Sequence, residues 1–239
     1  MALGCEAYRS SGGIATLAPA TFKPADAAAL DAQLCETVSY WLRQGKRFVT
    51  MAGEHTGVVG SVRAHSQFYD DLTVVQFDAH ADLRGEYENN PWNHACAAAR
   101  ILDFHRRLVQ VGIRSMAEEE HILARRLGIP IFAGEDIPRD DSPRWEPWLE
   151  GLVAATSANV YISFDCDVLD PSIMPATGTP EPGGLTWRQT NLILSALSHH
   201  RRVVGFDISE LSPIAGLNHP QFTIARLAYR LIAWMNSSG

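Results

Sequence analysis

Short runs of apolar residues alternate along the chain with longer segments in which apolar residues recur every three or four positions. Short continuous runs are typical of buried strands, and the wider spacing is typical of helices that cover a core. The run at 72–75 is an example of the first pattern, and Leu30, Leu34, Val38 and Trp41 are an example of the second. The sequence therefore predicts a regular alternation of strands and helices.

The pattern predicts strands at 46–51, 72–75, 107–113, 129–132, 159–164 and 202–206, with a further short strand at 14–17. It predicts helices from Asp26 to a stop at Gly45, then at 57–68, 94–105, 116–127, 145–155, 187–198 and 221–234. Glycine is favoured just after a helix, and threonine is favoured at a helix N-cap, the position of Thr186. The rest of residues 1–24 is rich in Gly, Ser, Ala and Pro, so we expect it to be irregular.

Strands that alternate with helices of this length predict an α/β fold with three layers, α/β/α. The sheet is expected to be mostly parallel, because each helix carries the chain back to start the next strand in the same direction. The sequence has no internal repeat, low-complexity tract or linker, and its 239 residues suit one large core. We therefore expect a single domain over 1–239.

Composition narrows the class of protein. The chain has 27 acidic and 20 basic residues and a net charge of −7, which argues against nucleic acid as a partner and fits a small cationic molecule. No apolar run is long enough to span a membrane, and the N-terminus lacks the residue order of a signal peptide. The cysteines, Cys5, Cys35, Cys96 and Cys166, form no CxxC pair. We expect reduced thiols and a cytoplasmic protein.

Four of the predicted strands end in polar clusters, at 54–55, 78–82, 165–167 and 207–210. In an open parallel sheet, ligands bind beyond the carboxyl ends of the strands. Side chains two residues apart in extended backbone point to the same side. The Asp and His side chains of the DxHxD segment therefore converge, and so do the two Asp side chains of the DxD segment. The sequence thus predicts one site at that edge of the sheet.

The donors in these clusters are four carboxylates and two imidazoles: Asp78, Asp82, Asp165, Asp167, His55 and His80. Four negative charges could not lie together unpaired, whereas two divalent cations would neutralise them. A carboxylate-rich set with two imidazoles suits Mn²⁺ better than a structural zinc site, although zinc, cobalt and iron stay open.

These motifs resemble those of the ureohydrolases, the arginase and agmatinase family. The family's GGDH, DAHxD, SxDxDxxDPxxxPxTGTPxPGG and DxxExxP segments correspond to residues 52–55, 78–82, 163–184 and 207–213. The resemblance covers roughly residues 45–236, and it is specific because the third motif is long and all four occur in order.

The resemblance implies an arginase-like fold, two Mn²⁺ ions per chain and assembly into a homotrimer or homohexamer. It implies that His55, Asp78, Asp82 and Asp165 hold one ion, and that Asp78, His80, Asp165 and Asp167 hold the other, with Asp78 and Asp165 bridging. It also implies that a hydroxide bridging the metals attacks a guanidinium carbon. Glu210 would orient the guanidinium, and His94 would help to move a proton to the leaving amine.

The loop after the second motif resembles that of bacterial and archaeal agmatinases. Its Glu86 and Glu88 would repel a substrate carboxylate and attract a terminal amine, although Arg84 is nearby. The resemblance therefore implies an agmatinase, which converts agmatine and water to putrescine and urea. Another linear guanidino or formimino compound, such as guanidinobutyrate or formiminoglutamate, stays open as the substrate.

Two rival readings come from other classes. A metal-binding but inactive relative is one, since the family's usual first βα unit with a Gly-Pro-Arg-type segment is not found. A short form or a truncated gene product would explain the same difference, which could expose a sheet edge or require a partner. A zinc deacetylase is disfavoured by the two-metal donor set. Ala52 and Glu54 also depart from the first motif, but neither is an expected ligand.

Several residues have ordinary readings. Taken alone, His94 could be a polar residue at a helix start, and Glu210 could pair with a surface arginine. Asp170, before a proline, is read as a turn-former, and Cys166 as a packed residue. Trp92 could line the pocket or anchor its loop. The remaining histidines are expected to be packed or solvated: His65, His105, His121, His199, His200 and His219.

Overall fold

A computed structural model describes residues 12–20 and 27–237 of the chain. Residues 12–20 are exposed and form neither helix nor strand, so the short strand expected at 14–17 is absent. The apolar residues there lack a surface to pack against, since Ile14 and Leu17 stay 46% and 44% exposed. The rest of the first 24 residues, Cys5 and the expected helix start at Asp26 lie outside the described residues.

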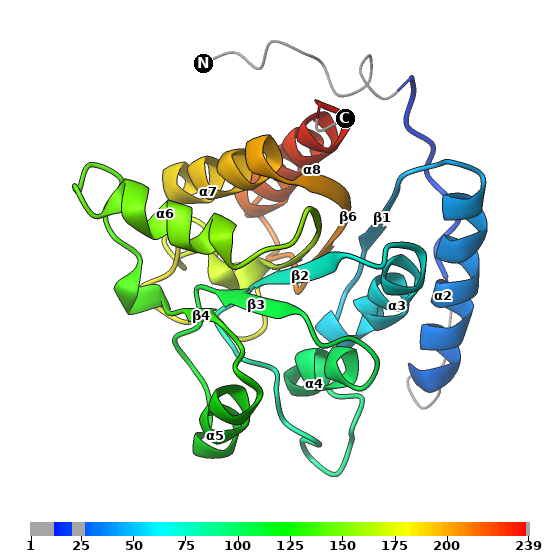
Figure 1. The fold of residues 1–239 in the computed structure, drawn as a ribbon, viewed down its shortest axis with the longest axis horizontal. Helices are drawn as coiled ribbons and strands as arrows, with labels where there is room; N and C mark the ends of the chain where they lie inside the picture. Colours follow the sequence, from blue (N-terminus) through cyan, green and yellow to red (C-terminus); the bar gives the residue numbers. More distant parts are fainter. Residues whose placement is uncertain (1–11, 21–26, 238–239) are drawn as a thin grey trace.

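The described strands form one sheet in the order β1-β6-β5-β2-β3-β4, and every pair of neighbours is parallel (Figure 1). Their bounds are β1 Phe48–Met51, β2 Leu72–Phe77, β3 Leu108–Val111, β4 Ile131–Phe132, β5 Asn159–Asp165 and β6 Arg202–Ser209. The predicted parallel sheet is confirmed. Because the strands are parallel, all their carboxyl ends lie along one edge.

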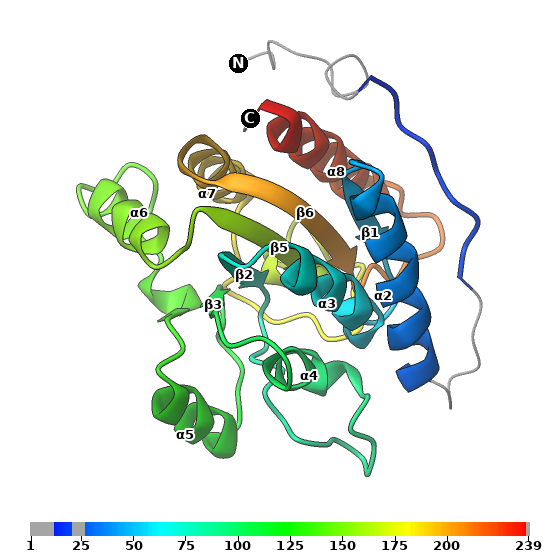
Figure 2. The same ribbon diagram turned by 45° about the vertical axis from the view of Figure 1, so that its right-hand side comes forward.

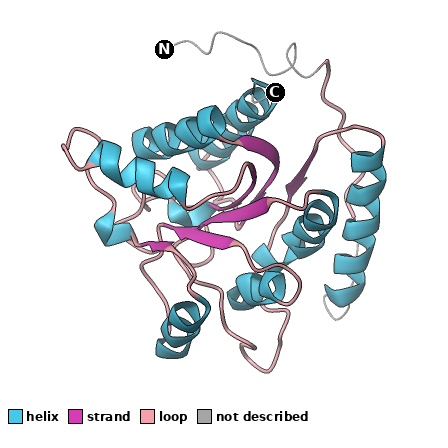
Figure 3. Cartoon of the chain, viewed as in Figure 1, coloured by secondary structure: helices cyan, strands magenta, loops and turns pink. Residues whose placement is uncertain are grey.

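Helices cover both faces of the sheet, which confirms the three-layer prediction (Figures 1 and 2). Their bounds are α2 Ala27–Arg43, α3 Val59–Phe68, α4 Ala97–Leu102, α5 Glu118–Leu127, α6 Trp145–Ala154, α7 Trp187–His200 and α8 His219–Ser237. One face carries α3, α4 and α5, with α2 packed outside α3, and the other face carries α6, α7 and α8 (Figure 3). No helix in the described ranges is long and apolar enough to cross a membrane.

The core consists of two apolar layers, one on each face. In β2, Leu72 and Val74 join the cluster under α3, α4 and α5, whereas Val75 and Phe77 join the cluster under α6, α7 and α8. All four side chains are fully buried. A strand buried on both faces needs no polar alternation, which is why the sequence reads as a continuous apolar run.

Some boundaries differ from the prediction for local reasons. The helix expected at 94–105 begins as a 3-10 turn, His94–Cys96, and α4 ends at Leu102. Asn93 caps the turn, because its side chain accepts a hydrogen bond from Ala95 N. The predicted caps are confirmed: Gly45 has a φ of 69°, and Thr186 forms a capping box with Gln189.

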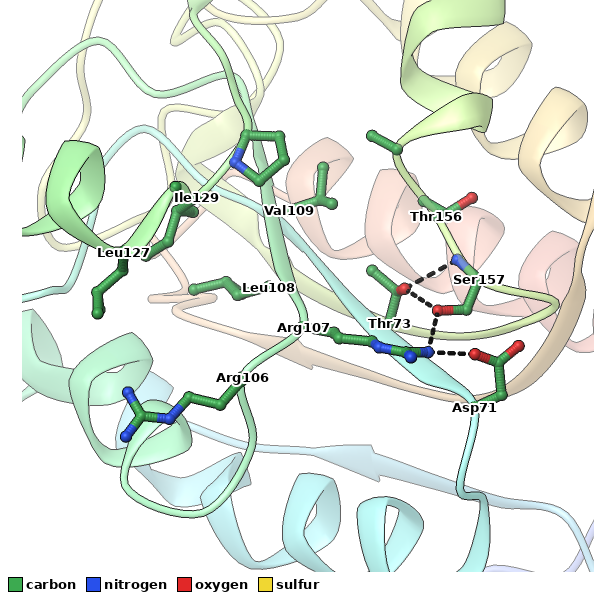
Figure 4. A pocket seen from close by; sticks show the side chains of 13 residues that line it. Asp71, Thr73, Arg106, Arg107, Leu108, Val109, Leu127, Ile129, Thr156 and Ser157 are labelled. Carbon is green, nitrogen blue, oxygen red and sulfur yellow. Dashed lines mark hydrogen bonds and ion pairs between the residues drawn. The ribbon is translucent and has the colours of Figure 1, made fainter.

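The amino ends of β2, β3 and β5 form the opposite edge, where a shallow cleft is lined by polar groups that bond one another (Figure 4). The Thr73 hydroxyl lies 2.6 Å from Ser157 Oγ and accepts a bond from Ser157 N. Arg107 donates to Asp71 and to Ser157. This network is separated from the carboxyl edge by the length of the strands.

A close contact between α3 and β6 fixes how the helix lies on the sheet. His65 is fully buried, donates from Nδ1 to the Ser61 carbonyl at 2.8 Å, and packs its ring 4.7 Å from that of Tyr161. Burial lowers the pKa of His65 to about 4, so the ring is neutral near pH 7. Gly205 faces the ring, and a Cβ placed there would lie 2.3 Å from His65 Nε2.

Gly205→Ala should therefore destabilise the fold. Because the ring is held on two sides, the added methyl forces a shift that costs about 2 kcal/mol, within the range for overpacked cores. This corresponds to a fall of about 4–8 °C in Tm for a chain of this size. Thermal unfolding of the purified variant measures the change.

Gly151→Ala is the matched control, because a Cβ there would first meet Phe132 Cε1 at 4.0 Å. Its Tm should stay the same or rise slightly, since alanine favours the helix. The double variant His65→Ala/Gly205→Ala should lose less than the sum of the two single changes. Strictly additive losses would contradict the proposed contact.

Candidate metal centre

The carboxyl edge of the sheet brings together the polar clusters that follow β1, β2 and β5. His55 starts a 3-10 turn after β1, the DAHAD segment follows β2, and Asp165 and Asp167 lie at the end of β5. The side chains are almost completely buried, with residue exposures between 0% and 4%, except that of His80, which is partly exposed. All six predicted ligands therefore lie in one place.

The first group of donors surrounds the His55 imidazole. His55 Nδ1 lies 2.9 Å from Asp82 Oδ2, 3.1 Å from Asp78 Oδ2 and 3.4 Å from Asp165 Oδ2. Three carboxylates from two different strands thus face one ring nitrogen. The four side chains are those that the resemblance to ureohydrolases assigns to the first ion.

The second group surrounds His80. His80 Nδ1 lies 3.0 Å from Asp167 Oδ2 and 3.6 Å from Asp78 Oδ1. Asp78 therefore turns one oxygen to each group, as a bridging ligand would. Asp165 directs only Oδ2 to the first group, because its Oδ1 accepts a bond from Asp167 N, and its bridging role stays a prediction.

Backbone amides fix one oxygen of three of these carboxylates. His80 N donates to Asp78 Oδ1 at 2.6 Å, Asp167 N donates to Asp165 Oδ1 at 2.9 Å, and Ala79 N donates to Asp167 Oδ1 at 3.0 Å. Aspartate readily forms a turn in which its carboxylate accepts a hydrogen bond from the backbone amide two residues later, as Asp78 and Asp165 do here. The i, i+2 spacing therefore matters because each second residue anchors the carboxylate of the first.

The donors alone do not balance their charge. Burial, together with repulsion from Asp78 and Asp167, raises the pKa of Asp165 well above its usual value, and burial and Asp78 raise the pKa of Asp82 to about 7. Burial would lower the pKa of His80, but its bonds to Asp167 and Asp78 outweigh this and raise it to about 10. Buried carboxylates that repel one another, with imidazoles among them, form a donor set that fits divalent cations.

The two residues expected to act on substrate lie beside this cluster. Glu210 Oε1 accepts a bond from His55 N at 2.8 Å, and Glu210 N donates to the Gly53 carbonyl at 2.7 Å. Burial raises the pKa of Glu210, and the His94 imidazole is near enough to lower it in part. His94 begins its 3-10 turn half-buried, with its ring 6.2 Å from that of Tyr87.

Ordinary roles are confirmed for Asp170 and Cys166. Asp170 accepts bonds from Ser172 N, Gly183 N and Gly184 N, so it shapes the loop and is not among the grouped donors. Cys166 is fully buried in the core, where burial raises its pKa well above the usual value. Trp92, for which pocket lining and loop anchoring were equal alternatives, packs against the core and its carbonyl accepts from Thr56, contacts that favour the anchoring role.

Arg114 has a role that the sequence reasoning missed. Its Nη2 donates to the carbonyls of Asp167 and Glu181, and its Nε donates to the carbonyl of Pro182. The guanidinium thus ties the loop after β5 to the end of β3. The available signal was an arginine two residues beyond Gly112 and three residues beyond the end of β3.

Comparison with known proteins places this geometry in context. The description "Arginase family" fits residues 5–234 of the chain. A protein of Synechocystis named N(1)-aminopropylagmatine ureohydrolase is 35% identical over 88% of this chain and 68% of its own. A Thermus thermophilus protein of the same name is 41% identical over 80% of this chain and 63% of its own. The chain thus spans about two thirds of the length of these relatives.

A solved structure supports the same placement. The agmatine ureohydrolase of Thermoplasma volcanium is 33% identical, with a TM-score of 0.78 over 90% of this chain and 71% of its own. The sheet and its covering helices are therefore shared with a protein of that name, over most of the present chain.

Mn²⁺ should stabilise the protein, and Asp165→Asn should abolish that gain. At a Mn²⁺ concentration about 100 times Kd, each filled site adds about 2.7 kcal/mol to the free energy of unfolding. Without metal, Asp165→Asn should not lower Tm, because it removes repulsion and its amide oxygen can still accept from Asp167 N. Thermal scans with EDTA and with Mn²⁺ measure both effects.

Asp170→Asn is the control, since this acid lies three residues after Asp167 but bonds only its own loop. It should lower the free energy of unfolding by roughly 1 kcal/mol for each hydrogen bond lost, and therefore lower Tm with and without metal. It should keep the full gain in stability from Mn²⁺. An Asp165→Asn variant that is stabilised by Mn²⁺ as much as the wild type would rule out this carboxylate as a ligand.

Proposed function

This chain belongs to the arginase family, and we propose that it is a ureohydrolase that uses two Mn²⁺ ions to cleave a guanidinium group to urea and an amine. The single observation that carries the proposal is the pair of donor groups sharing Asp78, with Glu210 bonded beside them. The presence of every expected ligand, together with His94 and Glu210, argues against an inactive relative.

We assign the ligands as the family resemblance implies: His55, Asp78, Asp82 and Asp165 for one ion, and Asp78, His80, Asp165 and Asp167 for the other. Bound divalent cations of this kind lower the pKa of coordinated water toward neutrality and polarise the group under attack. Manganese suits the oxygen-rich donor set. The remaining chemistry falls to residues of the chain.

Glu210 would orient the substrate. A guanidinium remains protonated in water, as the arginine side chain does, and its planar N–H groups match a carboxylate. One oxygen of Glu210 is already taken by His55 N, so Oε2 is the oxygen available to the substrate. Because the same bond joins Glu210 to a proposed ligand, the guanidinium would be held at a fixed distance from the metal cluster.

His94 would supply the proton for the leaving group. The scissile C–N bond breaks as water oxygen bonds to the guanidinium carbon, and the leaving nitrogen needs a proton to depart as an amine. The His94 imidazole is near enough to Glu210 to affect its pKa, so it would be placed to pass a proton to the nitrogen of a guanidinium that Glu210 holds. The overall balance is a guanidinium plus water giving neutral urea plus a protonated amine.

The loop at 83–93 favours a substrate whose tail is cationic. Glu86 and Glu88 are exposed in this loop, next to Tyr87, whose ring contacts that of His94. Arg84 forms no ion pair with either of these glutamates among the described residues: it pairs with Glu119 at 3.2 Å and lies over the Tyr87 ring. The two carboxylates are therefore free to attract an amine at the far end of the substrate.

Agmatine and its N1-aminopropyl derivative both fit this description. Agmatine carries one amine in its tail, and the aminopropyl derivative carries two. The names of the two relatives above favour the longer substrate, and the name of the solved structure favours agmatine. A homotrimer or homohexamer remains a prediction of the resemblance, and a cytoplasmic location remains a prediction of the sequence composition.

The purified chain, preincubated with Mn²⁺, should release urea from agmatine or N1-aminopropylagmatine and not from arginine or guanidinobutyrate. Glu210→Gln should lower kcat/KM by about 10²–10³-fold, as removal of a transition-state contact does. Asp165→Asn is the metal-free control. Urea release from none of these compounds, despite two bound ions, would favour an inactive relative or a formimino substrate.

Glu86→Gln and Glu88→Gln should raise KM for amine-bearing substrates and leave kcat unchanged. The side chains are exposed, so each charge is worth at most about 1 kcal/mol, or roughly a 5-fold change. Butylguanidine, which lacks the tail amine, should show no change in KM. Glu146→Gln on α6 is the control for net charge, and an equal rise in KM for butylguanidine would refute the assignment.

A further inference from the structure

A row of buried polar side chains crosses the sheet directly beneath the metal cluster. The row is Thr50, Asp207, Ser163, Gln76 and Gln110, and each pairs in register with the next across neighbouring strands. Four of the five are 0–1% exposed, and Thr50 is 9% exposed. The neighbouring positions in these strands are mostly apolar, so this row stands out from the core around it.

One half of the row reaches His55. Ser163 Oγ lies 3.0 Å from His55 Nε2 and donates its hydrogen to Asp207 Oδ1, also at 3.0 Å. A hydroxyl has one hydrogen to give, so Oγ accepts from Nε2–H. This bond holds the ring so that the other nitrogen, Nδ1, points toward the three carboxylates, where a bound cation would take the place of its proton.

The other half reaches the shared carboxylate, Asp78. Gln76 Nε2 donates to Asp78 Oδ2 at 2.7 Å, and Gln76 Oε1 accepts from Gln110 Nε2 at 2.9 Å. Gln110 Nε2 also donates to the Ala81 carbonyl at 2.7 Å, inside the DAHAD segment. The amide of Gln76 is thus oriented from behind so that it presents a donor to Asp78.

Stability alone gives no reason for this row. Buried polar groups cost free energy even when they are paired, and apolar side chains of similar volume are often as stable or more so. Gln110 Oε1 has no hydrogen-bond partner among the described residues. Burial raises the pKa of Asp207 to about 6, and a carboxyl group whose pKa rises on folding destabilises the folded state above that pKa.

We propose that the row is a positioning layer for the two ions that the proposed function requires, on which this inference rests. Ser163 and Asp207 hold the His55 ring, and Gln110 and Gln76 hold Asp78. Ser163 and Asp207 would affect one ion only, because His55 faces one donor group. Gln76 and Gln110 would affect both ions, because Asp78 belongs to both groups. The residues touch neither substrate nor metal and act through the ligands that they orient.

Mn²⁺ titration of the full chain, by calorimetry and by EPR, tests the two halves separately. Ser163→Ala should weaken binding of one ion by about 10–100-fold, the usual cost of removing a group that orients a ligand, and leave the other ion bound. The EPR spectrum should then change from that of a coupled pair to that of an isolated ion. Gln76→Leu should weaken both ions.

Asp207→Asn keeps an oxygen that can accept from Ser163 and removes only the charge. It should fold even if Ser163→Ala does not, and it should weaken the same single ion by a smaller factor. Thr73→Val is the matched control, because it removes a buried hydroxyl from β2 at the opposite edge (Figure 4). It should lower Tm and leave both Mn²⁺ affinities unchanged.

The inference is overturned if Ser163→Ala and Asp207→Asn bind both ions as the wild type does, or if Thr73→Val weakens the ions equally. A wild type that binds no Mn²⁺ overturns both this inference and the proposed function. A wild type that binds two ions, with variants that behave as expected, but that releases no urea would support the positioning layer and contradict the proposed function.

Discussion

Repulsion among buried carboxylates is the constraint on which the carboxyl edge of this molecule depends. Four carboxylates each have an oxygen within 3.4 Å of an imidazole nitrogen of His55 or His80: those of Asp78, Asp82, Asp165 and Asp167. These two imidazoles are the cations that face them. Like charges at such distances raise the free energy of the folded chain unless cations compensate. The arrangement therefore lowers the stability of the metal-free fold, and two divalent cations would neutralise the four carboxylates.

The parallel sheet makes that arrangement possible. Its two apolar layers bury the inner strands β6, β5, β2 and β3 on both faces, and this burial offsets the cost of placing charged side chains at the ends of the strands. Some strain remains in the backbone of the site. Asp82 and Glu210 have φ values of 52° and 61°, a region that residues other than glycine rarely adopt. Both lie in segments that the surrounding hydrogen bonds hold in place, which is where such strain persists.

Most of the fold could be predicted because buried parallel strands and covering helices have different periods. The run at 72–75 and the spacing of Leu30, Leu34 and Val38 each identify an element without any knowledge of its partners. The prediction failed where a tertiary contact decides the outcome. The expected strand at 14–17 has apolar residues but pairs with none of the described strands. The end of β6 was placed three residues too early, because Asp207 and Ser209 are buried polar residues that an apolar pattern does not detect.

The same distinction separates the predicted part of the site from the part that was missed. The donors of the DxH and DxD segments are local, since each carboxylate is anchored by the amide two residues on, and that spacing is visible in the sequence. The polar row beneath them joins residues up to 157 positions apart, and its members become neighbours only through strand register. A buried glutamine or serine in an apolar strand is a weak signal by itself. Five buried polar residues in one register row, four of them hydrogen-bonded toward the ligands above, are a signal that only the assembled sheet can give.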